Sequence, residues 1–267
     1  MQVIKINKLC SLLILAVGLL LASSCEKFAA QDEVYTMTYT VSCPTTKALG
    51  QGEAANYVWY GQYRLDESLA KSYEPVPVVD GKAVCPVEMV REQSYDVVFV
   101  AQHYDASGNP AYEINAADAQ LLMPDAAVAN SDNYDLFCGI AKEASYGDDK
   151  TRNIPLARKV ANFIFTATQE SWDAAATKPD ASEITIKGAA ASYDLLEETI
   201  SDTDKNVQFT TAPMPSDPLM LGAAFCLVNG DVDVQLTLYK GNTQTKTYSV
   251  DDVKAETNRR TNIIIGL

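Results

Sequence analysis

A strict alternation of apolar and polar side chains marks the N-terminal part of the chain, at residues 34–43. One side of this pattern holds Tyr35, Met37, Tyr39, Val41 and Cys43, and the other holds threonine and serine. A period of two is typical of a β-strand that buries one face. Pro44 has no N–H for a ladder hydrogen bond, so we predict that the strand ends there.

Similar short strand patterns recur along the whole chain between turn residues. Residues 56–64 form an aromatic run, and residues 231–239 alternate again before a turn at residues 240–242 and a partner strand at 243–250. Only residues 169–176 favour a helix, of about one turn. Strands at this spacing predict an all-β protein of antiparallel sandwiches.

The middle of the chain suggests where two domains meet. Residues 145–152 are polar and contain a glycine, as in a linker, and residues 153–165 look like one long strand that begins near Pro155. We therefore predict an N-terminal sandwich at residues 34–148 and a C-terminal sandwich at 149–267, with residues 153–165 as the first strand of the second. A chain of 267 residues is long enough for two such cores.

The first 24 residues have the features of a secretory signal. Lys5 and Lys8 precede an apolar run at residues 9–22, and small residues follow. Residues 21–25 resemble the lipobox of bacterial lipoproteins, which implies that Cys25 is acylated and becomes the N-terminus. Residues 25–33 would then be a lipid tether, and the protein would be exposed on the cell outer membrane. An ordinary secretory signal is the alternative.

The charge of the chain narrows the range of partners. Its formal net charge is −14, whereas a nucleic-acid partner requires a basic surface, so we expect none. The only histidine is His103, and no cysteine or histidine spacing fits a zinc site. Carboxylate pairs such as Asp231 with Asp233 lack the ligand set of a calcium loop. We expect no metal, no cofactor and no enzymatic activity.

Two groups of residues have both a structural and a functional interpretation. Cys43 and Cys85 could form a disulfide in an exported protein, or they could be small buried hydrophobic residues. Tyr57, Trp59 and Tyr63 would share one face of a strand. Such a face could be a platform for a glycan, but aromatic residues are also common in sandwich cores.

Several motifs resemble one bacterial family. Residues 135–139, 153–165 and 258–266, together with the lipobox, are similar to the fimbrillin-like lipoproteins of Bacteroides-type bacteria, and more narrowly to an uncharacterised two-domain subgroup related to type V pilins. The resemblance implies two tandem transthyretin-like β-sandwiches. In the true pilins of this family, a protease removes the first strand of the N-terminal domain. The groove that this opens accepts a strand from the next subunit.

The specificity of the processing protease helps to distinguish an anchor from a polymerising pilin. The best-known pilin protease cuts after arginine, and the first arginine of this chain is Arg64, inside the second predicted strand. We therefore predict a surface lipoprotein that acts as a pilus anchor, accessory or adhesion component, with other fimbrial subunits as partners through strand addition. The alternatives are a glycan-binding lipoprotein of a nutrient-uptake system and a polymerising pilin that is cleaved after Lys47.

Overall fold

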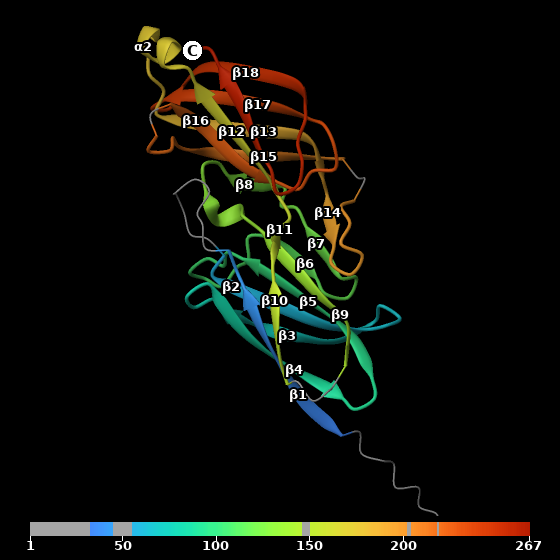
Figure 1. Cartoon of the computed structure of the whole chain (residues 1–267). Coiled ribbons are helices and arrows are strands. Elements are labelled where there is room, and N and C mark those ends of the chain that lie inside the picture. The colour runs from blue at the N-terminus through green and yellow to red at the C-terminus, as the bar shows by residue number, and fades with distance from the viewer. Residues whose placement is uncertain (1–32, 45–54, 146–149, 202–203, 218) are drawn as a thin grey trace, which may run out of the picture.

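The computed structural model describes residues 33–44, 55–145, 150–201, 204–217 and 219–267. Within these residues the chain is built almost entirely of β-strands, so the predicted all-β class is confirmed. The molecule is elongated, with one pair of sheets near each end (Figure 1).

Two sheets form the sandwich in the first half. The three-stranded sheet has the order β10-β1-β4, and the five-stranded sheet has the order β11-β9-β5-β2-β3. These strands are β1 (Val34–Ser42), β2 (Tyr57–Arg64), β3 (Leu69–Pro77), β4 (Lys82–Val90), β5 (Ser94–Gln102), β9 (Phe137–Ser145), β10 (Thr151–Pro155) and β11 (Ala157–Arg158).

The second half contains another three-stranded sheet and another five-stranded sheet. Their orders are β16-β12-β19 and β18-β17-β13-β15-β8. The strands are β8 (Ala126–Val128), β12 (Ala161–Ala167), β13 (Ala181–Ala190), β15 (Asp204–Pro213), β16 (Met220–Cys226), β17 (Val232–Lys240), β18 (Thr243–Val253) and β19 (Arg260–Ile265). The predicted hairpin of β17 and β18 and the short helix α2 (Gln169–Ala174) are confirmed.

The two halves repeat one strand order. Strands β1, β2, β3, β4, β5, β9 and β10 correspond in sequence order and in pairing to β12, β13, β15, β16, β17, β18 and β19. In each half the first strand is central in the three-stranded sheet and pairs in parallel with the last strand. The sandwiches are therefore not purely antiparallel, because each contains this parallel pair and the second also contains the parallel pair of β8 and β15.

A smaller sheet lies between the sandwiches. It has the order β14-β7-β6, with β6 (Glu113–Asn115), β7 (Gln120–Leu122) and β14 (Ser192–Asp194), and a 3-10 helix, η1 (Asp132–Tyr134), follows β8. Strand β8 comes from the first half of the sequence but pairs in parallel with β15 of the second. The core of the second sandwich consequently continues through Tyr112 and Leu121 to one face of the first half's five-stranded sheet.

The predicted single strand at residues 153–165 is wrong. The structure divides this stretch among three sheets, with β10 beside β1, β11 beside β9 and β12 between β16 and β19. Leu156 turns the chain from one sheet to the next, and Val160 is buried before β12 begins. Only the last of the three strands starts the second sandwich, and the observed pairing groups residues 151–158 with the first.

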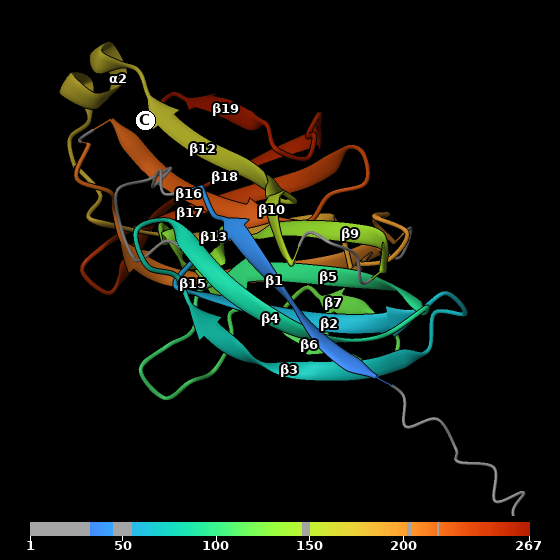
Figure 2. The same cartoon turned by 60° about the horizontal axis from the view of Figure 1, so that its bottom comes forward.

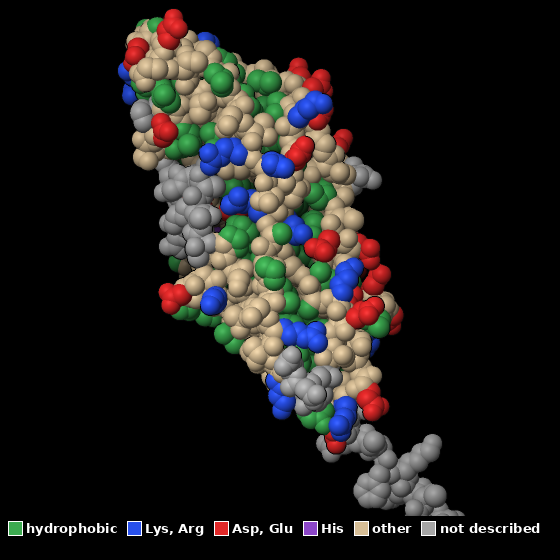
Figure 3. Space-filling view, viewed as in Figure 1, with side chains coloured by type: hydrophobic (Ala, Val, Ile, Leu, Met, Phe, Trp, Pro, Cys, Tyr) green, Lys and Arg blue, Asp and Glu red, His purple; other side chains and the backbone are tan. Residues whose placement is uncertain are grey.

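Charged side chains of both signs are spread among hydrophobic and other uncharged residues on the face shown in Figure 3. Lys and Arg side chains lie there singly or in small groups among uncharged residues, and many Asp and Glu side chains lie along the edge. In the part of the chain that the structure describes, no helix is long and apolar enough to cross a membrane.

Candidate functional site

The first strand, β1, is enclosed in the sheet that it shares with β4 and β10. It forms nine register pairs with β4 and five with β10. The side chains of Met37, Tyr39 and Val41 are fully buried between the two sheets, as the alternation of the sequence predicts. The Tyr39 ring lies 5.2 Å from the ring of Phe99 in the opposite sheet. Burial raises the pKa of Tyr39.

Both ends of β1 are held by further contacts. At the start, the Glu33 carbonyl accepts from the backbone N–H of Arg91 at 3.0 Å, and the Arg91 guanidinium lies 2.6 Å from the Glu33 carboxylate. A hydrogen bond from Tyr35 and the charge of Arg91 lower the pKa of Glu33. At the far end, the N–H of Cys43 donates to the carbonyl of Gly81 at 2.8 Å.

Removing β1 would leave a defined groove between β4 and β10. Strands β4 and β10, on the two sides of the groove, would each lack a partner strand. The floor of the groove would be the apolar face of the five-stranded sheet. An extended segment with apolar side chains at every second position could fill it by strand addition. The chemistry that this site can perform is therefore the pairing of β-strands.

An ion pair fixes the point where the chain leaves the first sandwich. The Arg158 guanidinium makes two hydrogen bonds of 2.7 Å to the carboxylate of Asp135, whose side chain is only 3% exposed. Arg158 also lies over the ring of Phe137. Burial raises the pKa of Asp135, and Arg158 opposes this shift. Sequence analysis missed this pair, because residues 23 positions apart gave no pattern that joined them.

A family profile matches most of the chain. The family described as fimbrillin-A associated anchor proteins Mfa1 and Mfa2 matches residues 67–266, which is three quarters of the sequence. The chain belongs to this family of fimbrial anchor proteins. The resemblance inferred from the motifs is thus confirmed, and the protein is a fimbria-related anchor or adhesion component.

Solved structures of Bacteroides proteins share the fold of this fimbrial anchor family member. A Bacteroides uniformis protein assigned to cell adhesion has 11% identity and a TM-score of 0.52, with 88% of this chain and 94% of that chain covered. A Bacteroides thetaiotaomicron protein assigned to polysaccharide binding has 12% identity and a TM-score of 0.50, with coverages of 85% and 90%. A search of curated proteins found no match.

The proposed disulfide is not present. Cys43 and Cys85 are both free and buried. Cys85 lies opposite Tyr39, and Cys43, the residue after β1, is four positions further along the chain, roughly 13 Å at the usual strand rise. A disulfide requires Cα atoms within about 7 Å. The interpretation of both residues as small apolar core residues is the one that the structure supports.

The aromatic platform is not on the surface. Trp59 and Tyr63 are 7% and 0% exposed, and only Tyr57 is partly accessible, at 36%. The layer between the two sandwiches covers this face, and the Tyr63 hydroxyl donates to the carbonyl of Ala116 at 2.8 Å. The face that sequence reasoning offered to a glycan is therefore core, because both faces of the five-stranded sheet are buried.

The remaining predicted site residues are placed as follows. Cys25 and Lys47 lie outside the described residues. His103 follows β5 and is half-buried, and its carbonyl accepts from the N–H of Ala111. Among the residues that the structure describes, no group of three or more His, Cys, Asp or Glu side chains could hold a metal ion.

Proposed function

We propose that the protein anchors a fimbria to the outer membrane through a lipid on Cys25, and that it keeps its first strand in place. Membership of the anchor family supports the fimbrial part of this proposal. The signal-like sequence before Cys25 supports the lipid tether. The absence of arginine between Cys25 and Arg64 favours a chain that is not processed there.

The single observation that carries the proposal is the position of β1. Its central place, with partners on both sides and three fully buried side chains, makes it part of the core of the first sandwich. A retained β1 occupies the groove that another subunit's strand would need. A subunit of this kind can end a row of subunits, because no further strand can enter at this point.

The geometry of the molecule suits a tether at one end. Strand β1 begins at one end of the elongated molecule, whereas α2 and the C-terminus lie at the other (Figures 1 and 2). A lipid attached before residue 33 would place the first sandwich next to the membrane. The second sandwich would then point away from the membrane, towards partners on the cell surface.

Cys25→Ser tests the tether. We expect this variant to shed fimbriae into the medium together with the protein itself, because the connection to the membrane is lost and the connection to the fimbria is kept. Cys10→Ser makes the same chemical change outside the lipobox and should leave fimbriae on the cells. Immunoblots of cell and medium fractions measure the outcome, and a Cys25→Ser protein that stays on the cells would contradict the proposal.

The mature N-terminus separates an anchor from a polymerising pilin. Mass spectrometry of the protein from its native host should find an acylated peptide that begins at Cys25. A mature chain that begins at Ala48 would mean that Lys47 is the processing site and that β1 is removed. That result would overturn the anchor proposal in favour of polymerisation.

A further inference from the structure

The chain crosses from the first half to the second along one line of strands. In Figure 1, β10, β11 and β12 follow one another along the long axis of the molecule. A pull on the second half therefore reaches β10 through the main chain of residues 156–160. It reaches the five-stranded sheet of the first half through the ion pair of Arg158 with Asp135 and through the shared core.

Strands β1 and β10 are connected to the rest of the protein at opposite ends. The two strands are parallel, with Thr38 opposite Thr151 and Ser42 opposite Pro155. The proposed lipid tether would precede the N-terminal end of β1, whereas the chain leaves the C-terminal end of β10 towards the second half. Tension between the tether and the second half consequently pulls the two strands in opposite directions along their length.

Paired strands resist a pull in this direction better than a pull that separates them from one end. When two strands are pulled past each other, the hydrogen bonds between them are loaded together and must break at nearly the same time. When the strands are peeled apart, the bonds break one after another. Forced unfolding is governed by the unfolding rate, so the direction of the pull decides how long the fold survives.

Hydrogen bonds hold β1 along both of its edges. It has nine register pairs with β4 and five with β10. Two further main-chain bonds extend the contact with β10, because the Thr38 N–H donates to the Lys150 carbonyl at 2.7 Å and the Leu156 N–H donates to the Ser42 carbonyl at 3.3 Å. The fully buried Tyr39 side chain would also have to leave the core if β1 slid out.

A separate contact lies at the point where tension would enter the fold. The Glu33 carbonyl accepts from the Arg91 N–H at 3.0 Å, and the Arg91 guanidinium lies 2.6 Å from the Glu33 carboxylate. The same guanidinium lies 5.8 Å from the centre of the Tyr35 ring. Both charged side chains are more than half exposed, so the pair adds little to stability at equilibrium. A pull on residue 33 would nevertheless load this pair first.

We propose that β1 and its partners β4 and β10 form a mechanical clamp, which sets the tension that the molecule withstands between the outer membrane and the fimbria. The proposal rests on the proposed anchor function, which supplies the tension. The clamp gives the retained β1 a second role beside filling its groove. It is the strand through which a pull on the tether enters the fold.

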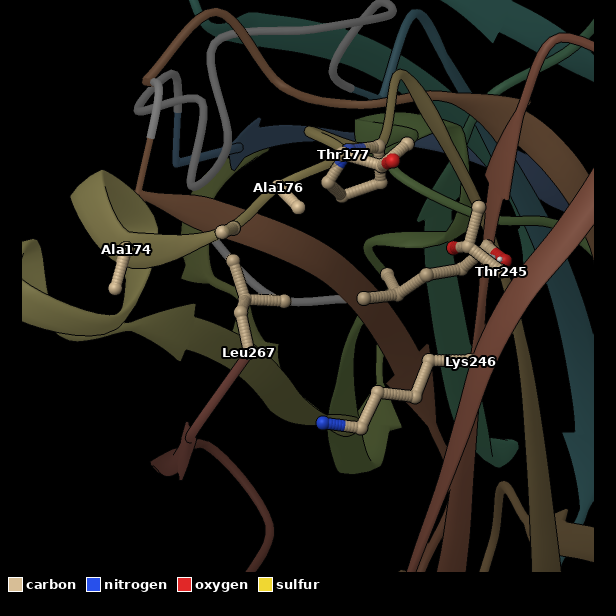
Figure 4. Close-up of a pocket in the computed structure, with 9 residues that line it drawn as sticks. Ala174, Ala176, Thr177, Thr245, Lys246 and Leu267 are labelled. Carbon is tan, nitrogen blue, oxygen red and sulfur yellow. Dashed lines mark hydrogen bonds between the residues drawn. The ribbon is translucent and has the colours of Figure 1, made fainter.

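Single-molecule pulling in two directions tests the clamp. The mature chain carries one handle at its N-terminus and a second on Ala176, which is exposed in the loop that forms a pocket of about 450 Å³ with β18 (Figure 4). In the control, the second handle is on Gln93, which is exposed and lies just after β4, next to the start of β1. The first arrangement pulls β1 along its length, and the second peels it from β4. We expect a higher rupture force with the handle on Ala176, and equal forces would overturn the proposal.

The length of chain that is released identifies the half that gives way. With the handle on Ala176, loss of β1 should unfold the first half and release residues 34–158, about 400 Å of extended chain. A first rupture in the second half would release residues 159–176, only about 60 Å. That shorter step would show that the clamp is not the limiting element.

Matched substitutions in β1 and β12 separate the clamp from general stability. Tyr39→Ala and Phe163→Ala each remove a fully buried aromatic side chain from the central strand of a three-stranded sheet. At a fixed force on Ala176, Tyr39→Ala should shorten the lifetime of the fold about 100-fold, and Phe163→Ala less than about tenfold. Similar effects of the two substitutions would contradict a clamp at β1.

Arg91→Ala is a milder variant that leaves the core intact. It removes the first contact to be loaded and should shorten the lifetime about two- to fivefold under the same force. Lys240→Ala is the matched control, since Lys240 forms a similarly exposed ion pair with Asp180 at 3.2 Å in the second half. This control should leave the lifetime unchanged. Equal lifetimes of the two variants would count against the Glu33 contact as part of the clamp.

The pulling measurements do not depend on the lipid, so they distinguish this inference from the anchor function. If Cys25→Ser sheds fimbriae as expected but rupture is the same in both pulling directions, the anchor function stands and the clamp is wrong. If Cys25→Ser cells keep their fimbriae while rupture depends on direction, the anchor function is wrong and the clamp remains as a property of the fold.

Discussion

The two sandwiches share one strand order and differ in how their edges are completed. In the first half, β11 covers the start of β9, and the Arg158 to Asp135 ion pair holds it there. In the second half the corresponding strand, β18, has no partner on its outer edge among the described residues. The opposite end of each five-stranded sheet shows the reverse among the described residues. In the second half β8 pairs with β15, whereas in the first half the corresponding strand, β3, is at the edge.

The two halves therefore differ at their sheet edges rather than in the repeated core. Exposed edges attract other strands, so natural proteins usually cover them or use them for binding. The first half is closed by segments of its own chain, including β1 and β11. The second half has a pocket beside β18, lined mostly by alanine, proline, leucine and threonine.

The largest expected change in unfolding free energy comes from substitutions in β1 and β12, the central strands of the two three-stranded sheets. Tyr39→Ala and Phe163→Ala each remove a fully buried aromatic side chain and should each cost about 3–5 kcal/mol of unfolding free energy. Because Trp59 packs in the core that the second half shares, Phe163→Ala should shift the transitions reported by both Trp59 and Trp172.

Urea unfolding of single-tryptophan variants measures this comparison. Tyr39 lies in the separate core of the first half, so Tyr39→Ala should shift the Trp59 transition more than that of Trp172. Equal shifts of both transitions with Tyr39→Ala would mean that the two halves unfold as one unit. The two cores would then not differ in how they contribute to stability.

The second prediction concerns the ion pair that closes the first half. Arg158→Ala should cost about 3 kcal/mol, because it leaves the buried Asp135 carboxylate without its partner. Burial already raises the pKa of Asp135, and losing Arg158 raises it further. A raised folded-state pKa means that the charged form is penalised in the fold, so this variant should lose stability as pH rises above the unfolded-state aspartate pKa of about 4.

Asp135→Asn is the companion variant for this pair. It removes the buried charge, so its unfolding free energy should vary less with pH than that of Arg158→Ala. Chemical denaturation at several pH values measures both. A stability loss in Arg158→Ala that stays the same as pH rises from about 3 to about 7 would contradict this explanation.

A smaller effect is expected where the occupied edge is tightly packed. Gly139→Ala places a Cβ atom 2.8 Å from Leu156 Cδ2 and 3.1 Å from the carbonyl oxygen of Pro155. The overpacking should cost about 1–2 kcal/mol. Thr243→Ala lies on the open edge of β18 and should change stability by less than about 0.5 kcal/mol. Thermal unfolding measures both, and equal effects would show that the two edges are packed alike.

The last prediction concerns the buried cysteine thiols. Their burial should change the rate at which they react with a reagent, and this rate is what the experiment measures. Burial raises the pKa of Cys43 to about 11 and those of Cys85 and Cys138 to about 12. An unfolded thiol has a pKa of about 8.5, so at pH 8 the thiolate is far more abundant in the unfolded chain. A disulfide reagent should therefore react slowly until urea unfolds the protein. Rapid reaction of the folded protein at pH 8 would contradict the burial.

The sequence predicted those features that depend on local pattern. The alternation around Tyr39 set which face of β1 is buried, because neighbouring side chains on a strand point to opposite sides. The hairpin of β17 and β18 followed from two alternating runs and the turn between them. The family resemblance came from short motifs, and the profile match confirmed it.

The features that depend on distant contacts could not be predicted in this way. Periodicity showed that Trp59 and Tyr63 share a face, but only the packing of the second half against that face showed that it is core. The stretch around Leu156 looked like one strand, because strand propensity does not reveal which sheet a residue joins.

By itself, the sequence determined the all-β class, the buried face of β1 and the relationship to fimbrial proteins, because these rest on side-chain order and short motifs. Only the tertiary structure decided how strands from the two halves combine, which edges are closed and where a pocket remains. The physical reason is that a strand edge is closed or open according to which distant segment pairs with it, and no local pattern carries that information.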